Sequence, residues 1–380
     1  MRIAIINLTG GGMSGGYKKY MRNVIPRMAI NPDIESILCA SPSSIDIQSW
    51  FSFLPKVNFI FCKPFNFINY VPERELKKAL KMFSPDVIFI PVERYFKFGR
   101  VPIVNMIQNM EPFAENIDVN SFTDKCRLYI QRLVAKRAMK KSDRVIAISK
   151  YVREFLSNTW GISERKIGLV YHGIESPQLK EYIRPKNIPK DLEGNFLFTA
   201  GSIRPARGLE DIIGAIKHLV LEKENVKGLV IAGDVSPNMI VYQNKLKEWI
   251  QIQNLSSYIY WVDKLSEKEM GWCYRNCKIF VMTSRVEACP NIVLEAMSYG
   301  CISISSDNSP LPEIFGDTAV FYPHNRVELL AKAIKPVSEW DEHQCGKASK
   351  KARERAAEFS WDVTVERLLT EFKKAIESFN

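Results

Sequence analysis

Short runs rich in valine and isoleucine recur along the whole chain and alternate with stretches of helical character. Continuous apolar strands separated by helices are typical of parallel sheets that are covered on both faces. The pattern therefore predicts an α/β protein with doubly wound sheets. The expected strands lie at residues 2–8, 35–40, 57–62, 86–91, 103–107, 144–149, 195–201, 228–233, 258–262, 278–284 and 301–306.

The alternation is interrupted once, between residues 175 and 194. That stretch holds three prolines and many charges without hydrophobic periodicity, as a linker does. A chain of 380 residues is also long for one hydrophobic core. We expect two Rossmann-like domains with a ligand site in the cleft that separates them. The expected ranges are 1–178 for the first domain, 179–194 for the linker, 195–358 for the second domain and 359–380 for a C-terminal helix.

The formal net charge of +11 indicates an acidic partner, such as a phosphate ligand, an anionic lipid or a nucleic acid. Segment 124–144 carries eight Lys and Arg residues against two Asp. Its apolar residues, among them Leu128, Leu133, Val134 and Ala138, are expected to share an inward face. The basic residues then form either a solvated helix face or a surface that rests on an anionic membrane.

Cysteine usage and hydropathy favour a cytoplasmic protein, and the basic segment would place it at the inner face of the cytoplasmic membrane. No uncharged apolar run reaches the 18 residues that a spanning helix needs, and the apolar N-terminus runs into glycines as a first strand does. The eight cysteines show no disulfide framework. Cys273 and Cys277 lie one helical turn apart, but no second pair follows at zinc spacing, so we expect buried thiols and no metal.

The first strand is followed by a glycine-rich loop in which Gly10, Gly12 and Gly15 fit G-x-G-x-x-G. A nicotinamide site would also need an acidic residue at the end of the second strand, and Glu35 stands at the opposite end, where that strand begins. A P-loop is excluded because Gly16 is followed by Tyr-Lys. The loop is suited to a phosphate or a close-packed sugar at a helix N-terminus, or it is a turn required only for packing.

A second loop, in "FTAGSIRPARGLEDIIGAI", follows the first strand of the second half. The strand ends near Gly201 and Ser202, and Arg204 and Arg207 stand between it and the next helix. Guanidinium groups are permanently charged and bind phosphate in a bidentate manner. The pattern favours a diphosphate clamp, with two surface arginines as the alternative.

Two glutamates flank the start of a later helix. Glu287 lies in the loop after the strand at 278–284, and Glu295 lies in the helix that Gly300 stops. A carboxylate accepts hydrogen bonds from vicinal hydroxyls of a ribose or a hexose. One glutamate for each sugar, with a diphosphate between them, describes a nucleotide-sugar site.

The stretch that begins at Glu287 and ends at Glu295 resembles the E-x7-E signature of retaining GT-B glycosyltransferases of the family-4 type. "GSIRPARG" is similar to that family's phosphate segment, with Arg207 where Lys is usual. The resemblance extends to the glycine loop, to "YHGIE" before the linker, to "IAGD" at 231–234, and to the terminal helix, which in such enzymes crosses back to the first domain.

This resemblance implies a role for each matching residue. Glu287 would contact the transferred hexose, and Glu295 would hold the nucleotide ribose. Arg204 and Arg207 would bind the diphosphate. The same resemblance assigns hexose and phosphate contacts to the amides around Asn291 and Ile292. Gly15 and Gly16 would approach the phosphate or the acceptor from the first domain.

The chain departs from the family pattern in the first domain. Many relatives have His-Asp where this chain has Gln108 and Asn109, and carboxamides cannot move a proton. Glu111 could serve as the general base in their place only if its side chain faces the cleft. His172 in "YHGIE" has either a cleft role or a structural one.

The implied reaction is transfer of a hexose to a saccharide or a lipid-linked acceptor in surface-polysaccharide or lipopolysaccharide synthesis of the bacterial type. Configuration would be retained, and arginines would replace a divalent cation, so no cofactor is expected. The alternatives are a sugar-nucleotide epimerase of the same fold and a basic nucleic-acid-binding protein. No zinc module, RNP-type motif or helix-turn-helix pattern accompanies the charge, so we expect no nucleic-acid partner. The donor base and the acceptor are left open.

Overall fold

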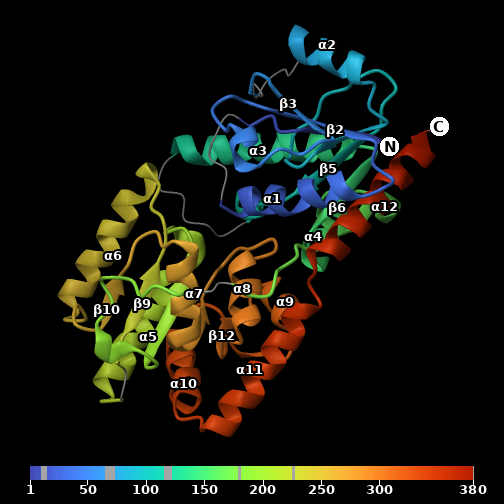
Figure 1. The fold of residues 1–380 in the computed structure, drawn as a ribbon. Helices are drawn as coiled ribbons and strands as arrows, with labels where there is room; N and C mark the ends of the chain where they lie inside the picture. Colours follow the sequence, from blue (N-terminus) through green and yellow to red (C-terminus); the bar gives the residue numbers. More distant parts are fainter. Residues whose placement is uncertain (10–14, 65–72, 115–121, 179–180, 225–226, 380) are drawn as a thin grey trace. The chain divides into compact units, whose positions relative to one another are not determined.

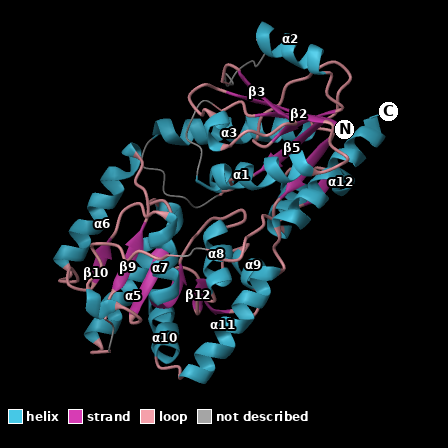
Figure 2. Cartoon of the chain, viewed as in Figure 1, coloured by secondary structure: helices cyan, strands magenta, loops and turns pink. Residues whose placement is uncertain are grey.

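The computed structural model describes residues 1–9, 15–64, 73–114, 122–178, 181–224 and 227–379, and its elements form two compact units (Figure 1). Unit 1 contains the described residues up to Gly173 and those from Ser360 onward. Unit 2 extends from Ile174 to Phe359. Figure 2 shows the strands inside each unit with helices beside them.

Unit 1 is built on a parallel sheet of the order β3-β2-β1-β4-β5-β6-β7. Its strands are apolar on both faces, as the sequence pattern predicts. They are β1 (Arg2–Ile6), β2 (Ser36–Ser41), β3 (Val57–Phe61), β4 (Val87–Ile90), β5 (Ile103–Ile107), β6 (Arg144–Ala147) and β7 (Ile167–Leu169). Its α-helices are α1 (Gly15–Ile30), α2 (Arg74–Phe83), α3 (Phe122–Lys141), α4 (Lys150–Glu154) and α12 (Trp361–Phe379).

Unit 2 is built on a second parallel sheet, of the order β10-β9-β8-β11-β12-β13. The strands are β8 (Phe196–Ala200), β9 (Leu229–Ala232), β10 (Ile259–Trp261), β11 (Cys277–Met282), β12 (Ser303–Ser306) and β13 (Ala319–Tyr322). The helices are α5 (Leu209–Leu221), α6 (Ile240–Ile252), α7 (Glu267–Asn276), α8 (Asn291–Tyr299), α9 (Leu311–Phe315), α10 (Val327–Ser338) and α11 (Glu342–Ala357). The predicted α/β class with two doubly wound domains is confirmed.

The strand order reverses once in each sheet. In unit 1 the reversal lies between β1 and β4, and in unit 2 between β8 and β11. Loops leave such a point in opposite directions, and ligands of open α/β sheets bind in the crevice outside the carboxyl ends of the strands there. The loops that follow these four strands are therefore where the fold places a site.

Helix α12 belongs to unit 1, as the expected crossing of the C-terminal helix requires. Leu368 and Phe372 are fully buried on its inward face. Val363 of the same helix is 38% exposed, and Val365 is the buried residue of that turn. The Arg144 guanidinium pairs with the Glu371 carboxylate and so ties β6 to the helix.

The chain passes between the units beside Gly173. A Cβ atom on Gly173 would collide with the backbone of Trp361, at the start of α12. One residue further on, the Ile174 amide donates to the carbonyl of Phe359 (2.8 Å). The glycine of "YHGIE" is therefore required where two passes of the chain lie side by side.

The described part of the expected linker packs on unit 2. Ile188 and Leu192 are buried, and the Gly194 amide donates to the carbonyl of Asn276 (2.9 Å). The Arg275 guanidinium lies over the Tyr182 ring at 4.7 Å from its centroid. Residues 181–194 therefore pack on the surface of unit 2, which the absence of hydrophobic periodicity in this segment did not predict.

Helix α3 contains most of the basic segment. Ala138 is buried as expected, and Leu128 and Val134 are half-buried. The expectation that Leu133 faces inward is wrong, since it is 50% exposed. Tyr129 is 64% exposed, so apolar and basic side chains share the outer face of this helix.

Candidate functional site

The arginine loop and the first glutamate of the E-x7-E stretch meet at the reversal point of unit 2. The Arg207 guanidinium donates from one nitrogen to Glu287 Oε1 (2.6 Å) and to Ser284 Oγ (3.2 Å). Both charged side chains are 15% exposed. The ion pair therefore joins the loop after β8 to the loop after β11 while keeping an open side toward solvent.

Backbone contacts hold the same two loops together. The Thr283 hydroxyl donates to the carbonyl of Arg207 (2.8 Å), and the Arg285 amide donates to the carbonyl of Ala206 (2.8 Å). Arg207 ends a short 3-10 helix, Pro205–Arg207, and Gly208 follows in the left-handed region (φ 59°). These contacts fix the arginine before any ligand arrives.

The remaining residues of the arginine loop surround this pair. Gly201 has φ 128°, and a Cβ atom there would lie 2.6 Å from the Arg207 guanidinium carbon. The glycine thus makes room for the arginine. Ser202 is exposed at the turn, and Arg204 is half-buried where the 3-10 helix begins. The predicted clamp residues are therefore neighbours, with Arg207 engaged by Glu287.

Helix α8 starts directly after the loop that carries Glu287. Asn291 and Ile292 form its first turn and are half-buried, and no side chain caps it at Pro290. The first amides of a helix have no intrahelical acceptor and carry the positive end of the helix dipole. An anion at this end of α8 would be stabilised by both effects.

Glu295 lies one turn further along α8 and is half-buried. Its Oε2 atom accepts a hydrogen bond from the Tyr274 hydroxyl of α7 (3.0 Å). Burial, followed by the charge of Glu295, raises the pKa of Tyr274 well above its ordinary value, so the phenol stays a donor. Sequence reasoning missed Tyr274, because no local pattern links a helix residue to a glutamate on the next helix.

In unit 1, Gln108 and Asn109 follow β5. The Gln108 side-chain amide donates to the carbonyl of Pro91 (3.2 Å), and Asn109 Oδ1 accepts from the amide of Glu111 (3.0 Å). Gln108 thus binds the neighbouring loop after β4, whereas Asn109 is exposed and shapes its own turn. Glu111 is half-buried at the start of a short 3-10 helix, Glu111–Phe113.

Glu93, in the loop after β4, is the carboxylate that directly contacts the Gln108 backbone, and sequence reasoning missed it. Its Oε1 atom accepts from the Gln108 amide (3.1 Å). Burial raises the pKa of Glu93, against the opposing effect of backbone amides and of Arg94. A signal was present, since Glu93 closely follows the predicted strand at 86–91, and β4 borders the reversal point of the sheet.

The remaining predicted residues of unit 1 are His172 and the glycines near the start of α1. His172 is 4% exposed and packs against the rings of Tyr20 and Trp361, at centroid distances of 5.1 and 6.0 Å. Its surroundings are those of a core residue. Gly15 is exposed and Gly16 half-buried at the start of α1, and a Cβ atom on Gly15 would contact none of the described residues within 4 Å. Gly10 and Gly12 lie outside the described residues.

Two family models match the two halves of the chain. The model described as "Glycosyltransferase Family 4" matches residues 15–176, and the model described as "Glycosyl transferases group 1" matches residues 181–356. Together the two matches cover most of the chain, so it belongs to the glycosyltransferases that these models describe. The stretch from Glu287 to Glu295 falls inside the second match, in the loop after β11 and the first turns of helix α8.

Relatives of this glycosyltransferase include proteins of polysaccharide synthesis. It is 26% identical over 188 residues to the serotype-specific mannosyltransferase WbdA of Escherichia coli, which covers 49% of the chain and 23% of WbdA. The chain thus spans about a quarter of the length of the WbdA proteins that it matches. It is 18% identical to the O-antigen chain mannosyltransferase RfbU of Salmonella typhimurium, over 88% of the chain and 91% of that protein.

Solved structures share its fold over the full length. Sucrose-phosphate synthase from Thermosynechococcus elongatus superposes with a TM-score of 0.76 at 16% identity and covers 100% of both chains. Anabaena HepE, solved with UDP and glucose, gives a TM-score of 0.75 at 14% identity over 98% of this chain and 100% of HepE.

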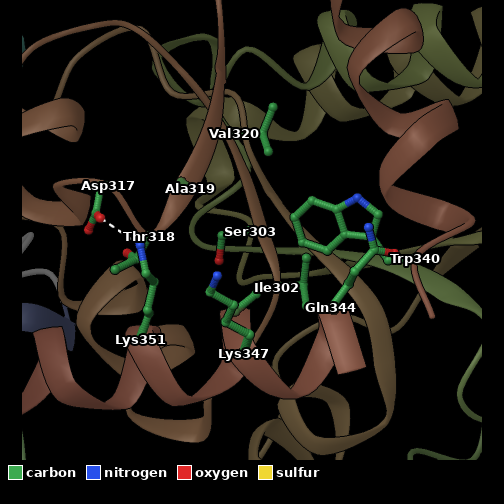
Figure 3. Close-up of a pocket in the computed structure, with 11 residues that line it drawn as sticks. Ile302, Ser303, Asp317, Thr318, Ala319, Val320, Trp340, Gln344, Lys347 and Lys351 are labelled. Carbon is green, nitrogen blue, oxygen red and sulfur yellow. Dashed lines mark hydrogen bonds and ion pairs between the residues drawn. The ribbon is translucent and has the colours of Figure 1, made fainter. Parts of the chain in front are cut away.

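Unit 2 of the glycosyltransferase also has a cavity of about 290 Å³ that lies away from the residues described above (Figure 3). It is lined at the amino ends of β12 and β13 by Ser303 and Ala319, and by Trp340 and the α11 residues Lys347 and Lys351. Arg207 and Glu287 follow the carboxyl ends of their strands. In a parallel sheet these are opposite edges, so the cavity is separate from the candidate site.

Among the described residues, no group of three or more His, Cys, Asp or Glu side chains is arranged to hold a metal ion. Across the same residues, no helix is both long enough and apolar enough to cross a bilayer.

Proposed function

We propose that this chain is a retaining hexosyltransferase that uses a nucleoside-diphosphate sugar. The observation that carries the proposal is the Arg207–Glu287 pair at the reversal point of unit 2, beside the first turn of α8. A guanidinium, a helix N-terminus and a carboxylate within one pair of loops match a phosphate that is bonded to a sugar.

In this proposal the donor binds to unit 2. Arg204, Arg207 and the amides of Asn291 and Ile292 bind the diphosphate, with Gly201 and Ser202 leaving room beside it. Glu295 accepts from the ribose hydroxyls. When the phosphate arrives, Arg207 shares its donors between the phosphate and Glu287, which fixes the carboxylate near the hexose. Gly15 and Gly16, at the start of α1 in unit 1, are assigned to a phosphate or to the acceptor.

The chemistry follows from where charge develops. Cleavage of the sugar–phosphate bond leaves an oxocarbenium-like hexose and a more negative diphosphate, which the two guanidiniums stabilise. The leaving phosphate accepts the proton of the acceptor hydroxyl as that hydroxyl attacks the same face, so the configuration is retained. Because arginine supplies permanent positive charge, the reaction as proposed needs no divalent cation.

The acceptor is assigned to unit 1 and is a saccharide or a lipid-linked saccharide. Asn109 and Glu93 offer a carboxamide and a carboxylate near the reversal point of that sheet, and such groups accept from sugar hydroxyls. The mannosyltransferase relatives of O-antigen synthesis support a role in surface polysaccharide formation. Gln108 and Glu111 are then residues that shape the acceptor region, whereas His172 is a core residue.

We also propose that α3 rests on the anionic inner face of the cytoplasmic membrane. Its outer face combines the exposed side chains of Tyr129, Ile130 and Leu133 with basic residues. Lysines and arginines attract anionic lipid, and apolar side chains enter the interface. A lipid-linked acceptor would be found there.

A thermal-shift panel with UDP, GDP, dTDP, CMP and NADH tests the donor assignment, repeated on Glu295→Ala. A ligand at about a hundred times its dissociation constant stabilises a fold by about 2.7 kcal/mol. One nucleoside diphosphate should raise the melting temperature of the wild type and lose much of that effect in the variant. A response to NADH alone would contradict the proposal, and interconversion of sugar nucleotides would favour the epimerase.

A further inference from the structure

Tyr274 and Glu295 come from neighbouring helices of unit 2 and meet at a single hydrogen bond. The Tyr274 hydroxyl donates to Glu295 Oε2 over 3.0 Å, and helices α7 and α8 are in contact. Tyr274 is 3% exposed, whereas Glu295 is half-buried. One partner is thus held in the core while the other reaches toward solvent.

The Tyr274 ring is fixed by its packing. It lies against three aromatic rings, those of Phe198, Phe280 and Tyr299, at centroid distances of 5.4, 5.9 and 5.3 Å. Edge-to-face and stacked contacts at these distances restrict the ring to one orientation. The position of the hydroxyl is therefore set by the core of unit 2.

Two thiols fix the backbone of the same residue. The carbonyl oxygen of Tyr274 accepts from Cys301 Sγ (3.2 Å) and from Cys277 Sγ (3.6 Å). This carbonyl belongs to the last turn of α7, where helix carbonyls lack intrahelical donors. The thiols of Cys277 and Cys301 thus anchor the end of the helix.

A carboxylate on a helix surface can rotate about its side-chain bonds. A hydrogen bond from a rigid donor removes that freedom, and a neutral donor does so without neutralising the charge. The phenol remains protonated for the reasons given above. Glu295 is thus held in one orientation with its negative charge intact, which a hydroxyl-binding carboxylate requires.

We propose that Tyr274 is the positioning residue that orients Glu295 toward the ribose of the donor, and that the pair makes the site select ribonucleotides over 2′-deoxyribonucleotides. This inference rests on the proposed function. A site that is built to accept from a hydroxyl rejects the analogue that lacks it, because a buried polar group is then left unpaired.

The experiment measures dissociation constants of one nucleoside diphosphate and of its 2′-deoxy analogue, with the base taken from the thermal-shift panel. Wild type should prefer the ribonucleotide by about tenfold or more, as expected for a hydrogen bond to a charged group. Tyr274→Phe should weaken ribonucleotide binding about tenfold and leave deoxynucleotide binding nearly unchanged, so the preference is lost.

Two further variants complete the design. Tyr260→Phe removes one hydroxyl that donates to the carbonyl of Ser257 on the surface, and it should keep the wild-type preference. Glu295→Gln should lose the preference as Tyr274→Phe does, and the double variant should be no worse than Glu295→Gln alone, because both act through one carboxylate.

The outcomes separate a positioning role from a structural one. Equal weakening of both nucleotides in Tyr274→Phe, or an unchanged ratio, would overturn the inference. If Tyr274→Phe does not fold, Glu295→Asp provides the same comparison with Tyr274 left in place, and an unchanged ratio there overturns the inference too. A wild type that binds nucleoside diphosphate without a ribose preference overturns this inference alone, whereas no binding at all overturns the proposed function with it.

Discussion

Arg207 and Glu287 form an ion pair of 2.6 Å between loops that follow two neighbouring parallel strands. The two residues lie 80 residues apart in the sequence. They can meet because the strand order reverses between β8 and β11, which makes these two strands neighbours. Because each side chain keeps 15% of its surface exposed, an incoming phosphate can reach the guanidinium without first breaking the fold.

Replacing Arg207 should separate diphosphate binding from nucleoside binding. Arg207→Ala is expected to weaken a nucleoside diphosphate by about tenfold or more, since a hydrogen bond to a charged group is worth about 1.5–3 kcal/mol. The affinity of the matching nucleoside should not change. Isothermal titration of both ligands checks this. Equal effects on the two would show that Arg207 acts only through the fold of the loop.

Glu93 should make the stability of the protein depend on pH in a defined direction. Its pKa is raised in the folded state by burial. The folded state therefore binds the proton of Glu93 more tightly than the unfolded state does. The contribution of Glu93 to the free energy of unfolding is complete below its pKa in the unfolded state. It is lost as the pH rises through its pKa in the folded state. Glu93→Gln should match the wild type at low pH and become relatively more stable above that window.

Melting temperatures of the two proteins, measured across that pH range, check the Glu93 prediction. A difference that stays constant with pH would contradict it. Glu111→Gln is a suitable control, since it removes a half-buried carboxylate from the adjacent 3-10 helix.

Membrane association should depend on the basic face of α3. Lys136→Glu combined with Arg137→Glu should greatly weaken sedimentation with anionic phosphatidylglycerol vesicles at low salt, because each basic residue near the surface contributes about 1 kcal/mol. Lys347→Glu combined with Lys350→Glu, on exposed α11, should bind as the wild type does. Equal loss in both variants, or salt-sensitive binding to RNA instead of vesicles, would contradict the assignment.

Gly173 should be intolerant of a side chain. Gly173→Ala places a methyl group against the backbone of Trp361, and overpacking of this kind costs about 1–3 kcal/mol. Gly346→Ala is the matched control, because it adds a methyl group to α11 where nothing lies within 4 Å. We expect a lower melting temperature only for the first variant. An unchanged melting temperature would mean that the crossing can relax.

The interior strands were predictable because they are continuously apolar, and the two missed strands are both at sheet edges. β7 (Ile167–Leu169) is short, and β13 (Ala319–Tyr322) is mostly half-buried. An edge strand is covered on fewer sides and needs less apolar sequence. The expectation that Leu133 lies on the inward face of α3 is wrong for a related reason, since a hydrophobic residue on a helix does not specify which face is covered.

The candidate site was predictable in part. The loop positions of Arg207 and Glu287 follow from strand, turn and helix signals within each stretch. Their pairing does not, because it depends on which strands become neighbours in the sheet. Glu93 and Tyr274 were missed for the same reason, since each contacts its partner through tertiary packing and not through a local motif.

The most direct test of the central claim is slow donor hydrolysis, which needs no known acceptor. Wild type and Glu287→Ala would be incubated with UDP-, GDP- and dTDP-hexoses while NMR follows the released sugar. The account predicts that wild type consumes one donor and releases a sugar with the anomeric configuration of that donor, and that the variant is about a hundredfold slower or more, as for loss of one electrostatic group. Release of the opposite anomer, or conversion of one nucleotide sugar into another, would contradict it.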